Sequence, residues 1–175
     1  MGSMQTPRPV MLFCSILSKD SPDAAREILR AAFGETAFES PVLPFDYTTY
    51  YEQEMGSPLT RMIFAFDDLL PRDSLPDVKI RTNGMEAAFL RDGKRMVNLD
   101  PGILTLENAC LATTKPYSHR IYLAKGIWTE ITLMYQDDSY HALPWTYPDY
   151  ASRELIAIFN AMRGIYRGRI KCQAV

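Results

Sequence analysis

The sequence predicts an α+β fold in which a ferredoxin-like β-α-β-β-α-β core is extended by an antiparallel β-meander and a C-terminal helix. Three observations predict it. Residues 9–17 (PVMLFCSIL) form an unbroken apolar run, which is typical of a strand buried on both faces. Apolar residues then recur at helical spacing over residues 25–33. Short β-type runs separated by turn residues fill residues 117–143, before a last amphipathic segment.

The core elements are assigned from hydrophobic periodicity and from the signals at their ends. In order, they are a strand at 10–17, a helix at 21–33, strands at 38–45 and 59–66, a helix at 74–90 and a strand at 96–99. Ser21-Pro22-Asp23 provides a helix start and Gly34 a helix stop. Pro41 and Pro44 cannot donate backbone hydrogen bonds, so the second strand is expected at a sheet edge.

The second half of the chain supplies the extension. A turn is expected at residues 98–102 (NLDPG), because Asp-Pro-Gly is a common turn sequence. Thr105 is expected to cap a short helix over residues 105–113. Strands at 117–123, 128–135 and 140–143 then form the meander, and a helix covers residues 150–167.

Composition and charge restrict the class of protein. The 175 residues suffice for one domain, assigned to residues 5–170, and residues 1–4 (MGSM) are interpreted as a cloning remnant. A net charge of −2 gives no field that would attract nucleic acid, and no apolar run approaches the ~20 residues that cross a membrane. Three widely spaced cysteines and the lack of a signal peptide favour reduced thiols and a cytoplasmic location.

The predicted hairpin around Lys125-Gly126 carries the first candidate site. If these two residues form a tight turn, His119 pairs with Thr132 and Ile121 with Glu130. His119 and Glu130 then share one sheet face, and Arg120 lies on the other. A carboxylate beside an imidazole orients the ring and favours its protonated form, as a general base or metal ligand requires. The alternative is a pair that only stabilises the sheet surface.

Other polar residues could complete a binding site. Asp100, near Asn98, could be a ligand or an acid–base group, or it could only bond its own backbone in the turn. Lys115 could contact an anion or cap the end of the short helix. A loop rich in tyrosine and acids could close over a ligand or pack on the sheet by its own rings; its tyrosines are Tyr47, Tyr50 and Tyr51.

Several segments together resemble a known family. They are PFDYTTYYEQEMG, VNLDPGILTL, LATTKPYSHRIYLAKGIWTEITLMY and LPWTYPDY, and the similarity extends from about Val10 to Tyr150. This set is similar to the bacterial domain-of-unknown-function family 4416. The resemblance implies a small bacterial cytoplasmic protein of undetermined activity, and it brings no catalytic residues with it.

The resulting hypothesis is a site for a small anionic molecule on the sheet face that carries the hairpin. The catalytic candidates are His119, Glu130 and Asp100, and the ligand-binding candidates are Lys115, Arg120, Asn98, Tyr47, Tyr50 and Tyr51. No metal ligand or cofactor is assigned, since no zinc, phosphate-loop or dinucleotide motif is present. Two alternatives stay open: a non-catalytic, ferredoxin-like binding or regulatory module, and a domain that binds a protein partner through its tyrosines and tryptophans. Formation of a homo-oligomer is open as well. Whether the protein is an enzyme is also open.

Overall fold

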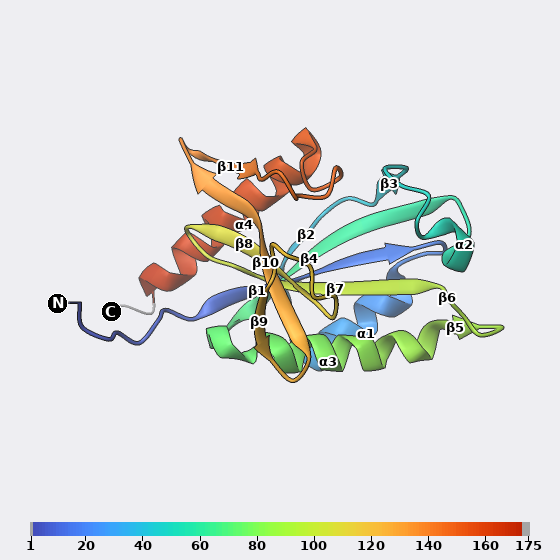
Figure 1. Cartoon of the computed structure of the whole chain (residues 1–175), viewed down its shortest axis with the longest axis horizontal. Coiled ribbons are helices and arrows are strands. Elements are labelled where there is room, and N and C mark those ends of the chain that lie inside the picture. Colours follow the sequence, from blue (N-terminus) through green and yellow to red (C-terminus); the bar gives the residue numbers. More distant parts are fainter. Residues whose placement is uncertain (1, 173–175) are drawn as a thin grey trace.

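A computed structural model of the chain describes residues 2–172, and within them nine strands form one antiparallel sheet (Figure 1). The strands are β1 (Val10–Ser18), β2 (Thr36–Glu39), β3 (Leu43–Phe45), β4 (Leu59–Leu70), β7 (Val97–Leu104), β8 (Asn108–Thr113), β9 (Ile121–Ala124), β10 (Ile127–Gln136) and β11 (Ser139–Ala142). Their order is β11-β10-β8-β7-β1-β4-β2, with β3 beside β4 and β9 beside β10. The α+β class and the antiparallel sheet are therefore confirmed.

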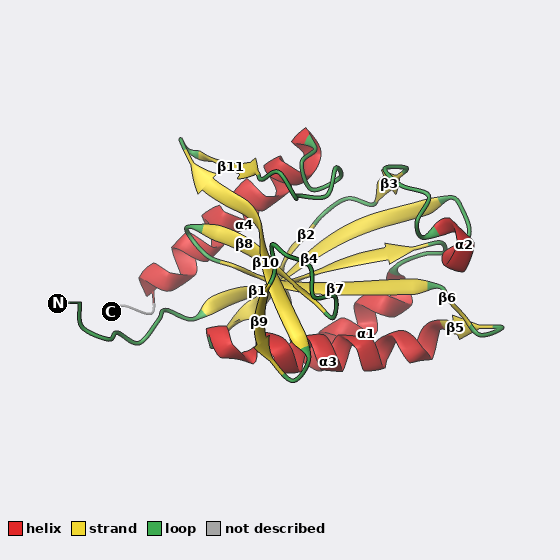
Figure 2. Cartoon of the chain, viewed as in Figure 1, coloured by secondary structure: helices red, strands yellow, loops and turns green. Residues whose placement is uncertain are grey.

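Helices cover both faces of this sheet (Figure 2). They are α1 (Asp23–Phe33), α2 (Glu52–Met55), α3 (Leu75–Glu86) and α4 (Arg153–Cys172), and a small hairpin of β5 (Leu90–Arg91) and β6 (Lys94–Arg95) follows α3. Helices α1 and α3 lie on one face, and α4 crosses the other (Figure 1). No helix within residues 2–172 is long and apolar enough to span a membrane.

Strand β1 lies in the middle of the sheet, and its apolar run supplies both cores. Leu12, Cys14 and Ile16 pack in the cluster that includes α1 and α3 residues. Met11 and Phe13, one position out of phase, pack in the cluster with α4, where Phe13 meets Phe159 edge-on at 5.1 Å. Alternation along a strand sends successive side chains to opposite faces, so a strand covered on both sides must be apolar throughout.

The first half of the chain agrees closely with the predicted elements. The predicted strands at 10–17, 59–66 and 96–99 correspond to β1, β4 and β7, and β1 pairs with both of the others. The predicted strand at 38–45 is interrupted: β2 and β3 both pair with β4, and Pro41 lies between them. As expected, these segments lie at the sheet edge.

Two predictions for residues 98–113 are wrong. Asp100-Pro101-Gly102 does not form a turn, because it lies inside β7, where Pro101 is opposite Cys14 of β1. The predicted helix at 105–113 is instead β8, which returns beside β7 after a short turn. Thr105 does cap a structure, but its hydroxyl accepts the amide N–H groups of Glu107 and Asn108 in that turn. Thr105 thus caps the turn of the β7–β8 hairpin and not the start of a helix.

The predicted meander is present as β9, β10 and β11, and β8 is an additional strand beside β10. Strand β10 pairs with β9 through residues 127–129 and with β11 through residues 133–136. It pairs with β8 over residues 128–134 along its other edge. The strand that sequence periodicity misassigned as a helix thus joins the meander to the rest of the sheet.

The three cysteines are free thiols spread over the structure. Cys14 is buried, Cys110 is half-buried and Cys172 is exposed. Burial raises the pKa of Cys110 to about 11, so this thiol is protonated at neutral pH.

Candidate functional site

The sheet opens into a cleft between β7 and β8. These strands pair only from Gly102 to Leu104, and among the described strands residues 97–101 of β7 pair with β1 alone. A cavity of about 700 Å³ occupies the opening. Its walls come from α3 (Lys79, Asn83, Glu86), the loop at 45–51, residues 111–117 and residues 147–150, together with Arg61, Arg95, Asn98, Asp100, Arg120 and Glu130.

Pro101 explains why the two strands separate at this point. The turn is closed by a hydrogen bond from the Thr105 N–H to the Asn108 carbonyl, 2.9 Å long. In an antiparallel ladder alternate opposed residues exchange hydrogen bonds, so the next bonded pairs are 103 with 110 and 101 with 112. Proline has no N–H to donate. Pro101 therefore cannot complete a bonded pair with Ala112, and the recorded pairing of β7 with β8 ends at Gly102 and Leu111.

Helix α3 replaces β8 along the open edge of β7. Glu86 accepts the Leu99 N–H at 2.7 Å, and the Lys79 ammonium donates to the Leu99 carbonyl at 3.0 Å. Both side chains are buried, and each satisfies a backbone group that would otherwise lack a partner. Sequence analysis missed both residues. Their i, i+7 spacing, which places them on one helix face, was the available signal.

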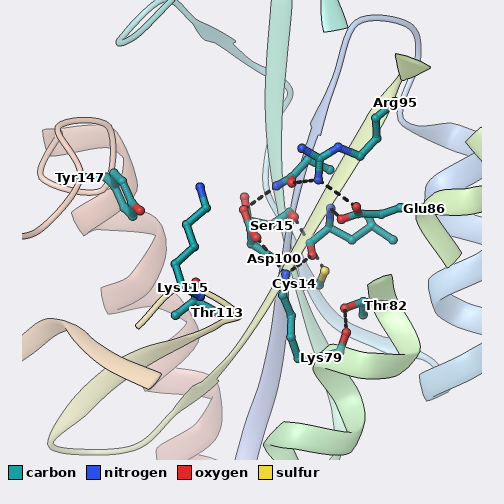
Figure 3. A network of polar contacts seen from close by, with 12 residues as sticks. Cys14, Ser15, Lys79, Thr82, Glu86, Arg95, Asp100, Thr113, Lys115 and Tyr147 are labelled. Carbon is teal, nitrogen blue, oxygen red and sulfur yellow. Dashed lines mark hydrogen bonds and ion pairs between the residues drawn. The ribbon is translucent and has the colours of Figure 1, made fainter. Parts of the chain in front are cut away.

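Asp100 lies on the cleft floor within a network of charged groups (Figure 3). Its carboxylate accepts hydrogen bonds from Lys79 at 3.1 Å and from the Asn98 amide at 2.6 Å. Burial alone would raise the pKa of Asp100, but the charges of Lys79 and Arg61 and these hydrogen bonds outweigh it, and the net shift is downward. Asp100 is therefore a carboxylate at neutral pH.

This arrangement makes a prediction about pH. Asp100→Asn should lower the free energy of unfolding by about 1–3 kcal/mol at pH 7, since a charge-assisted hydrogen bond to the buried Lys79 is lost. The contribution of a carboxyl with a lowered pKa is present above its unfolded pKa of ~3.9 and disappears as pH falls through the folded value. The difference between wild type and variant should therefore shrink below about pH 4.

Urea denaturation at pH 7 and at about pH 3 measures this difference. Asp77→Asn is the matched control, because its partner Lys125 is exposed and surface ion pairs contribute little. A difference for Asp100→Asn that stays constant over this pH range would contradict the assignment.

Arg61 lies buried beside the cleft and is a second residue that sequence analysis missed. Its guanidinium pairs with Asp149 at 2.8 Å, donates to the Ser15 hydroxyl at 2.5 Å and lies 4.8 Å from the centre of the Phe45 ring. Burial raises the pKa of Asp149 despite the opposing charge of Arg61. No sequence signal links residues 61 and 149, because they are brought together only by folding.

The hairpin prediction is right at the turn and wrong beyond it. Lys125 and Gly126 form the turn with φ values of 55° and 77°, and Ala124 faces Ile127. A β-bulge follows, so Trp128 is opposite Tyr122 and Thr129 is opposite Ile121. The extra residue moves the register by one position.

The shifted register places Arg120 beside Glu130. Arg120 Nε donates to Glu130 Oε2 at 2.7 Å, and His119 Nε2 is 3.0 Å from the same oxygen. The predicted contact between His119 and Glu130 is thus confirmed, whereas the placement of Arg120 on the opposite face is wrong. Arg120 and Glu130 line the cleft, but His119 does not: its ring stacks on Trp145, with the ring centres 5.6 Å apart.

Arg120 is held by several partners at once. Besides Glu130, its guanidinium donates to the Thr113 hydroxyl at 3.3 Å, the Lys115 carbonyl at 3.0 Å and the Tyr147 hydroxyl at 3.0 Å. Since a guanidinium has five N–H groups, these contacts leave one for a ligand. The first role of Arg120 is to fix the loop after β8 against the hairpin.

Lys115 and the tyrosine loop form the outer wall of the cleft. The Lys115 ammonium donates to the Tyr50 hydroxyl at 3.0 Å, while Tyr51 packs against Phe45 with ring centres 6.1 Å apart. The hydrogen bond with Tyr50 raises the pKa of Lys115, which is therefore fully protonated at neutral pH. Figure 3 shows Lys115 between Tyr147 and Asp100, which lies on the cleft floor. Because no helix ends at Lys115, its predicted capping role is wrong.

The structure gathers most of the predicted site residues around one cavity. Asn98, Asp100, Lys115, Arg120, Glu130 and the tyrosines Tyr47, Tyr50 and Tyr51 all line it. No hydrogen bond within residues 2–172 connects Asp100 to His119 or Glu130. Nor does that part of the chain contain a group of three or more His, Cys, Asp or Glu side chains placed to hold a metal ion.

Comparison with known proteins gives one match. Residues 8–166 match the model of a family described as domain of unknown function (DUF4416). No curated protein and no solved structure matches the chain. The cleft is therefore the basis for any functional argument.

Proposed function

The chain belongs to the DUF4416 family, whose function is unknown, and we propose that it binds a small anionic molecule in the cleft between β7 and β8. A cavity of about 700 Å³ is within the size range of small-molecule sites. Aromatic rings and a few converging polar groups line it, which is the usual character of such sites.

The observation that carries this proposal is the state of Lys115. Four other cations line the cleft, and each has a carboxylate partner: Arg61 with Asp149, Lys79 with Asp100, Arg95 with Glu54 and Glu86, and Arg120 with Glu130. Among the described residues, no carboxylate lies within ion-pair distance of Lys115, whose hydrogen-bond acceptor is the neutral Tyr50 hydroxyl. An acidic group on a ligand would complete this ion pair.

Other parts of the earlier hypothesis remain within this proposal. The ferredoxin-like assignment is supported by the order β7-β1-β4-β2, with α1 following β1 and α3 following β4. A single functional domain over residues 5–170 and a cytoplasmic location also stay predictions. Catalytic roles for His119, Glu130 and Asp100 are not needed for binding and stay predictions too.

Anion binding can be measured by NMR titration of the ¹⁵N-labelled protein with inorganic phosphate and, separately, with acetate. We expect saturable shifts of the Thr114 and Lys115 amide signals, because both residues line the cleft. Lys115→Met should weaken binding by about tenfold or more, in line with the loss of a charge-assisted contact. Its thermal stability should change little, since Lys115 makes no ion pair with the protein.

Lys125→Met is the matched control. It removes the same charge from an exposed lysine in the β9–β10 turn, outside the cleft, where Lys125 pairs with Asp77. This variant should bind both anions like the wild type. Equal weakening by the two variants would show a non-specific charge effect, and unchanged binding by Lys115→Met would exclude the proposed site.

A further inference from the structure

We infer that the anionic ligand is hydroxylated: its acidic group pairs with Lys115, and its hydroxyl groups bind to Asp100 and Arg61 on the cleft floor. The class is that of sugar acids and sugar phosphates, which share hydroxyl groups attached to an acid. This inference rests on the proposed function and specifies its ligand. The argument depends on the position of Asp100 and Arg61, on their remaining hydrogen-bonding positions and on the balance of charge between them.

The sheet register brings Asp100 and Arg61 together around Ser15 of β1. Ser15 is directly opposite Asp100 in the β1–β7 pairing (Figure 3), and the Cβ atoms of such pairs are about 4.5–5.5 Å apart. Arg61, on the other side of β1, is opposite Leu17, which has the same parity as Ser15 and therefore faces the same side of the sheet. The Ser15 hydroxyl accepts a hydrogen bond from Arg61 Nη1 at 2.5 Å. The guanidinium and the carboxylate thus lie on one sheet face, on either side of Ser15.

Both groups have hydrogen-bonding positions that no residue within 2–172 occupies. A guanidinium has five N–H groups, and the partners of Arg61 face its Nε and Nη1, so the two N–H groups of Nη2 remain. A carboxylate has about four acceptor positions, and Lys79 and Asn98 use two of those of Asp100. The Asp100 side chain is 27% exposed and lines the cleft, so a ligand can reach it.

The Tyr51 hydroxyl is a third group at this place. Burial and the charge of Asp100 raise the pKa of Tyr51, and the charge of Arg61 opposes this shift, so the hydroxyl is protonated and close to both. Tyr51 lines the cleft, and its hydroxyl makes no hydrogen bond within the described part of the chain. Because a hydroxyl both donates and accepts, Tyr51 can bond to a polar ligand group that also contacts the charged pair.

The balance of charge favours neutral hydroxyl groups on the floor over a second acid. Arg61 is paired with Asp149, and Lys79 is paired with Asp100, so the floor has no cation without a carboxylate. A second acidic group would meet the Asp100 carboxylate, which repels it. A hydroxyl accepts from the guanidinium and donates to the carboxylate, and it matches both without a change of charge. It also reproduces the bonds of a water molecule that it displaces.

The walls of the cleft suit a ligand of this kind. Six tyrosines line the cavity: Tyr47, Tyr50, Tyr51, Tyr117, Tyr147 and Tyr150. Each ring presents an apolar body with a polar hydroxyl at its tip, as a sugar presents C–H groups between its hydroxyls. The cavity volume of about 700 Å³ is within the range of sites for ligands of this size.

Two matched pairs of probes test for the hydroxyl groups: gluconate with acetate, and glucose 6-phosphate with inorganic phosphate. Each is titrated into the ¹⁵N-labelled full chain. The hydroxylated member of a pair should bind about tenfold more tightly than its parent anion, because it gains hydrogen bonds on the floor. It should shift the amide signals of Tyr51 and Asp100 together with that of Lys115. The parent anion should shift only the signals near Lys115.

Tyr51→Phe provides an independent readout. It removes the hydroxyl and keeps the ring that packs against Phe45. This variant should lower the ratio of the two affinities in a pair by about threefold or more, because one hydrogen bond to the ligand is lost. Tyr122→Phe is the matched control, since Tyr122 is an exposed tyrosine of β9 outside the cleft. The control should leave the ratio at its wild-type value.

The outcomes distinguish the two levels of the argument. A preference for the hydroxylated member in only one pair would support the inference and identify the acid as a carboxylate or a phosphate. Equal affinities within both pairs, or equal effects of Tyr51→Phe and Tyr122→Phe, would overturn the inference of a hydroxylated ligand. In that case Lys115-dependent binding of acetate or phosphate would leave the proposed function standing. If no probe binds in a way that depends on Lys115, both proposals fail.

Discussion

Arg61→Met is expected to lower the free energy of unfolding by about 3–5 kcal/mol, because it leaves the buried Asp149 carboxylate without its ion-pair partner. The side chains of Arg61 and Asp149 are 6% and 5% exposed, so water cannot take the place of the lost guanidinium. Methionine keeps the length and apolar contacts of the arginine stem. The loss therefore reports mainly on the uncompensated charge. Urea denaturation followed by circular dichroism measures it.

The effect should depend on pH in a defined direction. Burial already raises the pKa of Asp149, and a folded-state pKa above the unfolded value means that the folded protein binds this proton more tightly. As pH falls through the raised value, Asp149 becomes neutral, and its burial costs less. The deficit of Arg61→Met should therefore shrink in acid, as that of Asp100→Asn does, but it should begin to shrink at a higher pH, because the pKa of Asp149 is raised and that of Asp100 is lowered.

Two variants control this prediction. Arg26→Met breaks a pair whose side chains are 27% and 22% exposed, so it should cost about 1 kcal/mol or less. The double variant Arg61→Met with Asp149→Asn removes both charges and should recover part of the loss. A single-variant loss no larger than that of Arg26→Met would contradict the account of a buried ion pair.

Gly102→Ala is expected to lower the free energy of unfolding by about 3 kcal/mol, at the upper end for an overpacked core position. A Cβ atom at residue 102 would overlap the Phe13 ring and the backbone carbonyl of Cys110, closer than real Cβ atoms approach. Phe13 is fully buried against Phe159 and cannot rotate away, and the carbonyl belongs to β8 itself. The strand would have to shift, which would also disturb the end of the β7–β8 ladder and the cleft beside it.

Gly168→Ala is the control for this substitution. Gly168 lies in α4, where an added Cβ would meet no atom within 4 Å, so the change should be neutral or stabilise the protein by up to ~1 kcal/mol. Thermal and urea denaturation of both variants give the comparison. If Gly102→Ala is as stable as wild type, β1, β7 and β8 do not pack as closely at residue 102 as the structure describes.

Much of the candidate site was already visible in the sequence, because its residues cluster locally. The Lys125-Gly126 turn brings the flanking segments together, and His119 and Glu130 meet as predicted, although the predicted register is wrong. The bulge after the turn was not encoded in any short pattern, so the partner of Glu130 was predicted one residue away. One residue of slip reverses the face of a side chain, and Arg120 was misplaced for that reason alone.

The sequence by itself determined the α+β class, the strands and helices of the first half and the family, because periodicity and end signals are local properties of the chain. The tertiary structure alone decided the cleft. Asp100-Pro101-Gly102 has the composition of a turn, yet β1 on one side and α3 on the other hold it as a strand. Pro101 also lacks an N–H that could bond to β8, and β8 lies beside Pro101 only after folding. Which backbone groups are paired, and with what, depends on neighbours distant in sequence.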